Sequence, residues 1–151
     1  MSATDTFEEI LKRDGVLVYK TRGVSMRPML RENRDLVVIR TYDGRLRKYD
    51  IPLYRRSGNR YVLHRIIEVR DNDYVIRGDN PFAKEYGITD NRIVGVLTEF
   101  KRNGKTISVN STGFRVYSRV WNFIYPIRFV LHKARRFGGK IKRKLKGGTK
   151  S

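Results

Sequence analysis

Residues 61–77 read Tyr-Val-Leu-His-Arg-Ile-Ile-Glu-Val-Arg-Asp-Asn-Asp-Tyr-Val-Ile-Arg. Two runs in this stretch, 61–69 and 74–77, are rich in Val, Ile, Leu and Tyr, the residues that favour β-strands. Asp71-Asn-Asp73 lies between them and has the composition of a turn. The stretch therefore predicts two strands separated by a tight turn.

The same pattern recurs on both sides of this stretch. Further strands are predicted at 16–19, 36–40, 51–55, 92–100 and 106–109, with turn compositions such as Tyr-Asp-Gly, Ser-Gly-Asn and Arg-Asn-Gly-Lys between runs. Seven short strands at this spacing predict a mainly β, antiparallel, partly closed and barrel-like core. Helical spacing over Asp5–Arg13 adds a short N-terminal helix.

Composition limits the chemistry. A chain of 151 residues can form one domain with an appendage. It has no cysteine and two histidines that lie far apart, which argues against disulfides, thiolate nucleophiles and zinc sites. We expect no metal and no cofactor, so that catalysis would depend on hydroxyl, imidazole, amine and carboxylate groups.

The net charge of +19 is divided unevenly along the sequence. All 15 acids lie in residues 1–99 together with 19 basic residues, so that this part carries only +4. Residues 100–151 hold 15 basic residues and no acid. This division is typical of an ordinary domain with an electrostatic arm.

We place a domain boundary at residue 112, between a β domain of residues 1–112 and a basic tail of residues 113–151. Apolar residues recur at helical spacing in the tail, at Val116, Val120, Phe123, Ile124, Ile127, Val130 and Leu131. Pro126 should kink or split this helix because proline lacks a backbone N–H. The apolar and basic character favours an anionic membrane surface as partner, with packing on protein as the alternative. Nucleic acid is disfavoured as a partner because the aromatic residues of the tail do not alternate with its basic run, which starts at Lys140.

The sequence contains no run of about 18 apolar residues and no apolar region near Met1. We therefore expect a chain that is neither exported nor membrane-spanning. Basic segments favour the cytoplasmic leaflet. The predicted location is the cytoplasm or the cytoplasmic face of the membrane.

One serine has the surroundings of a nucleophile, in Gly23-Val-Ser25-Met-Arg-Pro28-Met29. Gly23 allows an unusual backbone angle and Pro28 stiffens the turn, which would present the Ser25 hydroxyl at a fixed edge. His64 is the candidate base, since His132 lies in the basic tail. The alternative interpretation is structural, because Val62, His64 and Ile66 would share one face of a strand.

Five motifs in order resemble the superfamily of type I signal peptidases and SOS-repressor peptidases, serine endopeptidases with a β-rich core. They are 23–29, Lys48-Tyr-Asp-Ile-Pro-Leu-Tyr54, Tyr61-Val-Leu-His-Arg-Ile-Ile67, Ile76-Arg-Gly-Asp-Asn80 and Ile93-Val-Gly-Val96. Most bacterial members and the repressors have a lysine base where this chain has His64. A histidine there resembles the endoplasmic-reticulum and archaeal branch.

The resemblance implies a role for each matched residue. Ser25 would attack the scissile carbonyl and His64 would take its proton, with Gly23, Val24, Met26 and Pro28 around the substrate and the oxyanion. An acid should orient the histidine. Asp79, Glu85 and the more distant Asp90 all remain candidates, since the family pattern has aspartate where this chain has Glu85.

The resulting expectation is a serine endopeptidase of the signal-peptidase type that cleaves a peptide or a leader-bearing protein. One alternative is a catalytically silent relative that binds peptides. Another is an adaptor that acts on membranes or nucleic acid through its basic tail.

Overall fold

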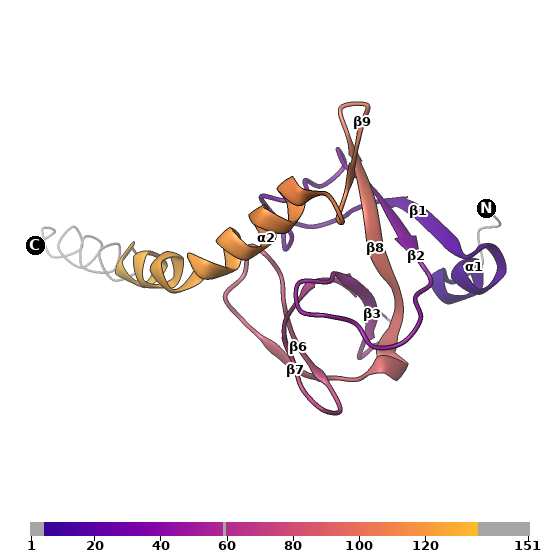
Figure 1. Ribbon diagram of the computed structural model, residues 1–151, viewed down its shortest axis with the longest axis horizontal. Coiled ribbons are helices and arrows are strands. Elements are labelled where there is room, and N and C mark those ends of the chain that lie inside the picture. The colour runs from indigo at the N-terminus through magenta and orange to yellow at the C-terminus, as the bar shows by residue number, and fades with distance from the viewer. Residues whose placement is uncertain (1–4, 59, 136–151) are drawn as a thin grey trace, which may run out of the picture. The chain divides into compact units, whose positions relative to one another are not determined.

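The computed structural model describes residues 5–58 and 60–135 (Figure 1). The chain divides into two compact units, residues 1–118 and residues 119–151. The first unit contains the β-strands and the start of the C-terminal helical segment, and the second continues that segment.

The first unit is mostly antiparallel β, and its larger sheet curls into a half barrel, which confirms the predicted fold class (Figure 1). Its helices are α1 (Phe7–Asp14) and the beginning of α2 (Thr112–Phe123), with a single 3-10 turn at Asp90–Arg92. Its strands are β1 (Val16–Lys20), β2 (Leu36–Arg40), β3 (Pro52–Arg56), β4 (Arg60–Leu63), β5 (Arg65–Val69), β6 (Tyr74–Arg77), β7 (Glu85–Ile88), β8 (Ile93–Arg102) and β9 (Lys105–Ser108).

Two sheets share these strands. The larger has the order β1-β2-β8-β3-β4, with β9 paired to β8, and the smaller has the order β5-β6-β7. The pairing register of β8 shifts opposite Val38/Ile39 and again opposite Leu53/Tyr54. Such β-bulges bend a strand and increase its twist, which accounts for the curl of the larger sheet.

The prediction of one strand over 61–69 is wrong at His64. The chain leaves the larger sheet at Leu63 and enters the smaller sheet at Arg65, so that His64 is the residue between β4 and β5. Its amide donates to Pro52 O at 3.4 Å, whereas that of Ile66 donates to Asp50 O at 2.9 Å. The alternation that would have placed Val62, His64 and Ile66 on one face therefore does not hold.

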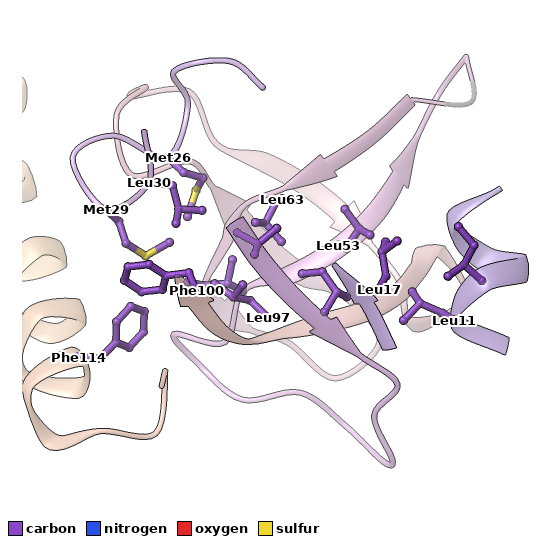
Figure 2. Packing of buried hydrophobic residues seen from close by; sticks show 14 residues of the cluster. Leu11, Leu17, Met26, Met29, Leu30, Leu53, Leu63, Leu97, Phe100 and Phe114 are labelled. Carbon is purple, nitrogen blue, oxygen red and sulfur yellow. The ribbon is translucent and has the colours of Figure 1, made fainter. Parts of the chain in front are cut away.

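The first unit contains two clusters of buried apolar side chains. The larger cluster runs from Leu11 of α1 through Leu17, Leu53 and Leu97 to Phe100 and Phe114 (Figure 2). The smaller cluster joins the two sheets, because Ile66, Tyr74, Ile76 and Ile88 of the smaller sheet pack with Tyr54 of β3 and Ile93 of β8. Burial of apolar area at about 25 cal/mol per Å² makes these clusters the main source of stability.

Helix α1 begins and ends at residues that the sequence marks clearly. Thr6 and Glu9 form a capping box, and Gly15 ends the helix with φ of 70°. Ile10 and Leu11 are buried against the larger sheet. Phe7 at the start of α1 packs on Tyr19 and Tyr61, with ring centroids 5.1 and 5.0 Å apart.

Two helices follow the β domain. Helix α2 ends at Phe123, and the next helix occupies residues 125–135 of the described chain. The break precedes Pro126, which has no N–H to donate to the preceding turn, as the sequence predicted. The basic run that starts at Lys140 lies outside the described residues.

Candidate functional site

Ser25 lies on the loop of residues 21–35, which connects β1 to β2. The two ends of the loop are held together by backbone hydrogen bonds, from Thr21 N to Asp35 O at 3.5 Å and from Asn33 N to Thr21 O at 3.2 Å. Gly23 has φ of 85°, in the region that the sequence analysis anticipated for this glycine. After Ser25 the side chains of Met26, Met29 and Leu30 enter the larger core (Figure 2).

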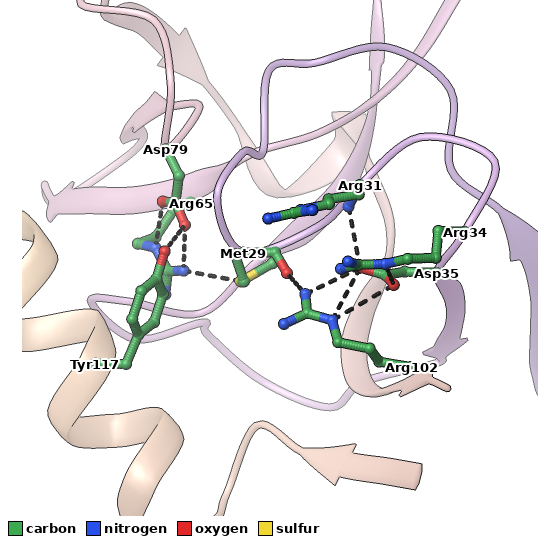
Figure 3. Close-up of polar contacts among 8 residues, drawn as sticks. All are labelled: Met29, Arg31, Arg34, Asp35, Arg65, Asp79, Arg102 and Tyr117. Carbon is green, nitrogen blue, oxygen red and sulfur yellow. Dashed lines mark hydrogen bonds and ion pairs between the residues drawn. The ribbon is translucent and has the colours of Figure 1, made fainter. Parts of the chain in front are cut away.

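Asp35 anchors the base of this loop. The Asp35 side chain is fully buried and accepts hydrogen bonds from the Arg31 amide at 3.0 Å, from Arg34 Nε at 2.7 Å and from Arg102 Nη2 at 2.9 Å (Figure 3). Arg102 also donates to the Met29 carbonyl. Burial alone would raise the pKa of Asp35, but the bonds from Arg34 and Arg102 outweigh it and hold this pKa well below its usual range.

Residues 78–81, which follow β6, pack against the backbone carbonyl of Ser25. The Asn80 amide donates to the Ser25 carbonyl at 2.9 Å. At Gly78 a Cβ atom would lie 2.6 Å from the same carbonyl oxygen and 2.9 Å from the ring of Pro81. A glycine is therefore required here for the close approach of the two segments.

His64 is in hydrogen-bond contact with Glu85. The distance from His64 Nδ1 to Glu85 Oε1 is 2.9 Å, and the Tyr54 hydroxyl donates to the same oxygen at 2.8 Å. Arg56 donates to both oxygens of Glu85, from Nε at 2.9 Å and from Nη2. Because an ionised carboxylate only accepts hydrogen bonds, Nδ1 of His64 must carry the proton and Nε2 of the neutral ring is left as the acceptor.

Burial controls the protonation of this group. His64 is only 6% exposed, and its burial lowers the pKa below the ordinary value of 6.5, although Glu85 opposes this shift. Burial would raise the pKa of Glu85, but the hydrogen bonds from Arg56 and Tyr54 lower it below its usual value. At neutral pH the ring is therefore neutral and the carboxylate is ionised, the combination that a general base and its orienting acid require.

The other candidate acids have different partners. Asp79 binds Arg65 through both carboxylate oxygens, at 2.8 Å each, and both side chains are buried (Figure 3). Arg65 also donates to Ser118 at 2.6 Å, and the Tyr117 hydroxyl donates to Asp79 at 3.3 Å. Asp90 accepts a hydrogen bond from Tyr74 at 2.6 Å. Of the three acids named from the sequence, Glu85 is the one in hydrogen-bond contact with His64 Nδ1.

Ser25, His64 and Glu85 line one cleft of about 1180 Å³. Its walls include residues of β1 and β4, the two strands at the ends of the larger sheet's strand order. Within residues 5–58 and 60–135, no hydrogen bond joins the Ser25 hydroxyl to His64. The described geometry thus brings the two residues to one cleft without a direct bond between them.

The neighbours of Ser25 divide into two groups. Gly23 and the buried Met26 line the cleft, whereas Val24 and Pro28 are exposed to solvent. In the part of the chain that the structure describes, the Ser25 amide makes no hydrogen bond to protein. This amide can therefore act as a donor toward an oxyanion.

No group of three His, Asp or Glu side chains suited to hold a metal ion occurs in the described ranges. Four further residues build the site but were not predicted from the sequence, namely Tyr54, Arg56, Arg65 and Asp35. Tyr54 and Arg65 belong to the motifs 48–54 and 61–67, which could have indicated them. Arg56 and Asp35 gave no sequence signal that distinguishes them from other charged residues.

Comparison of the chain with protein-family models, with curated proteins and with solved structures found no match.

Proposed function

We propose that this chain is a serine endopeptidase in which Ser25 is the nucleophile, His64 the general base and Glu85 the acid that orients the histidine. The contact of 2.9 Å between His64 Nδ1 and Glu85, in a cleft that Ser25 also lines, carries the proposal. A histidine held in this tautomer has its Nε2 free to accept a proton.

The reaction proceeds in two stages. Ser25 Oγ attacks the scissile carbonyl while His64 Nε2 takes the hydroxyl proton, and the Ser25 amide donates to the oxyanion. Collapse of the tetrahedral intermediate breaks the C–N bond, and the imidazolium gives its proton to the leaving amine. A water molecule then attacks the acyl-enzyme with His64 again as base, which releases the acid product and restores Ser25.

The cleft suits an extended peptide. Strands β1 and β4 end the strand order of the larger sheet, and residues of both line the cleft. Edge strands have unpaired backbone N–H and C=O groups that can pair with a peptide backbone. The proposed substrate is therefore a peptide or a leader-bearing protein segment bound in extended form.

The missing Ser25–His64 hydrogen bond favours one competing proposal, a silent relative that binds peptides without cleaving them. Hydrogen bonds between catalytic groups are often long in free enzymes and shorten when substrate binds.

A cleavage assay separates the two proposals. Wild type, Ser25→Ala and His64→Ala are incubated with a mixed library of decapeptides, and products are identified by mass spectrometry. Cleavage by wild type alone supports the peptidase, and equal products from all three contradict it.

We further propose that the second unit binds an anionic membrane surface. Val120, Phe123, Ile127, Val130 and Leu131 recur at helical spacing and are exposed, Phe123 to 83%. The described part of this unit has basic residues and no acid, with Arg119, Arg128, Lys133 and Arg135. Exposed apolar residues beside basic ones are typical of helices that lie at a lipid interface. Among the described residues, no helix has the length and apolar character needed to span a membrane.

A further inference from the structure

The cleft concentrates positive charge. Its lining contains four basic residues and one acid, a net charge of +3, whereas residues 1–99 as a whole carry only +4. The β domain of residues 1–112 carries +7, because Lys101, Arg102 and Lys105 add three charges to those of residues 1–99, so the cleft lining accounts for three of these seven charges. A cleft lined by one sign of charge raises the local concentration of ligands of the opposite sign.

Three of these cations have no acidic partner among the residues that the structure describes. Arg56 is paired with Glu85, but Lys20, Arg22 and Arg60 are exposed and form no ion pair with any described residue. Lys20 is the last residue of β1 and Arg60 is the first residue of β4. Unpaired cations therefore occur on both edge strands that would flank an extended peptide.

We infer that the cleft selects peptides with acidic side chains near the scissile bond, and that Lys20, Arg22 and Arg60 bind these carboxylates. The inference rests on the proposed peptidase function and adds the substrate class. Arginine can bind a carboxylate through two parallel N–H···O bonds, and lysine provides a point charge. Single-stranded nucleic acid also carries negative charge, but the unpaired backbone groups of two edge strands match a peptide backbone.

A binding experiment on the full-length Ser25→Ala protein tests the substrate class without cleavage. The probes are three fluorescein-labelled decapeptides of one scaffold, in which four positions are all Glu, all Gln or all Lys, and binding is followed by anisotropy. We expect the Glu peptide to bind about tenfold more tightly than the Gln peptide at low salt, since each exposed ion pair contributes roughly two- to fivefold. The difference should shrink as salt rises.

Two triple variants assign the effect to the cleft. Lys20→Gln/Arg22→Gln/Arg60→Gln should bring the affinity of the Glu peptide close to that of the Gln peptide. Arg40→Gln/Arg47→Gln/Lys48→Gln removes the same charge from exposed positions outside the cleft and should retain the preference. An equal loss of Glu-peptide affinity in both variants would overturn the inference, because the preference for the Glu peptide would then come from the basic tail or from the overall charge. Tighter binding of a dT10 oligonucleotide, abolished by the cleft variant, would overturn it as well.

Cleavage rates separate this inference from the proposed function. Wild type is assayed with the same three peptides, and kcat/KM should be highest for the Glu peptide. Cleavage with no charge preference would overturn the inference and leave the peptidase intact. Charge-selective binding without cleavage of any peptide would contradict the peptidase and leave the acidic preference standing.

Discussion

His64 Nδ1 lies 2.9 Å from Glu85 Oε1, and the same carboxylate accepts hydrogen bonds from Tyr54 and Arg56. Burial and the bond to Glu85 raise the pKa of Tyr54 well above its usual value, so that its hydroxyl stays a donor. The hydrogen bonds from Tyr54 and Arg56 therefore hold the Glu85 carboxylate in position independently of its contact with His64. The orientation of His64 depends on this fixed carboxylate, which makes Glu85 the most informative residue to change.

Glu85→Gln should change the pH profile of cleavage. The basic form of His64 is the active one, so kcat/KM of wild type should rise with pH and reach half its plateau below pH 6.5, since burial lowers the pKa of His64. Loss of Glu85 removes a group that raises this pKa and leaves Arg56 unneutralised. The midpoint should move to still lower pH and the plateau should fall by about 10²-fold or more.

Glu68→Gln is the matched control for this experiment. Glu68 also pairs with an arginine, Arg70 at 2.8 Å, but it is exposed on β5. The pH profile of kcat/KM for Glu68→Gln should coincide with that of wild type. A Glu85→Gln protein with an unchanged midpoint and an unchanged plateau would show that Glu85 does not act on the base.

The strand pattern could be predicted from the sequence because alternation and turn composition are local signals. The hairpin turn at Asn103-Gly104 illustrates this, since both residues have positive φ, of 50° and 76°. Strand β7 was missed because Glu85-Tyr-Gly-Ile88 is short and contains a glycine with φ of 69°. It is nevertheless the strand that brings Glu85 to His64.

The partners of the site residues could not be predicted because they depend on how the two sheets meet. Nothing in Leu63-His64-Arg65 indicates that the chain changes sheets there. After this change of sheet, Arg65 is buried and pairs with Asp79, and it does not line the cleft that His64 and Glu85 line. Sequence reasoning could therefore name candidate acids without choosing between them.

Gly78→Ala should lower kcat/KM strongly, beyond what an equally crowded glycine elsewhere in the fold would do. The new Cβ would lie 2.6 Å from the Ser25 carbonyl, so either Ser25 or the 78–81 segment must move. A displacement of about 1 Å in a reacting group can cost about 10²-fold in rate. Gly95→Ala is the control, because its Cβ would meet Ile39 at 2.7 Å and Arg40 O at 2.9 Å.

Both glycine variants should lose about 1 to 3 kcal/mol of unfolding free energy through crowding. Urea unfolding measures this loss, and kcat/KM is compared at a temperature where both variants are folded. Only Gly78→Ala should show the large drop in kcat/KM. Similar rates for the two variants would mean that the 78–80 segment does not position Ser25.

Arg65→Met should destabilise the β domain strongly. It leaves the buried carboxylate of Asp79 without its guanidinium, which typically costs about 3 to 5 kcal/mol. The double variant Arg65→Met/Asp79→Leu should recover much of this loss, because no buried charge then remains unpaired. Arg70→Met breaks the exposed pair with Glu68 and should leave the unfolding free energy nearly unchanged. Equal unfolding free energies for Arg65→Met and wild type would contradict a structural role for this pair.

Membrane binding by the second unit should depend on both its apolar and its basic residues. Full-length protein should co-sediment with vesicles of phosphatidylserine and phosphatidylcholine at low salt, and less so at high salt, because screening weakens attraction between basic residues and the anionic leaflet. Phe123→Asp/Ile127→Asp should reduce the pelleted fraction at least several-fold, since both side chains are highly exposed and apolar. Tyr86→Asp changes a similarly exposed side chain on β7 and should pellet like wild type. Equal pelleting with pure phosphatidylcholine, or no loss in the double variant, would show that residues 119–135 do not bind an anionic surface.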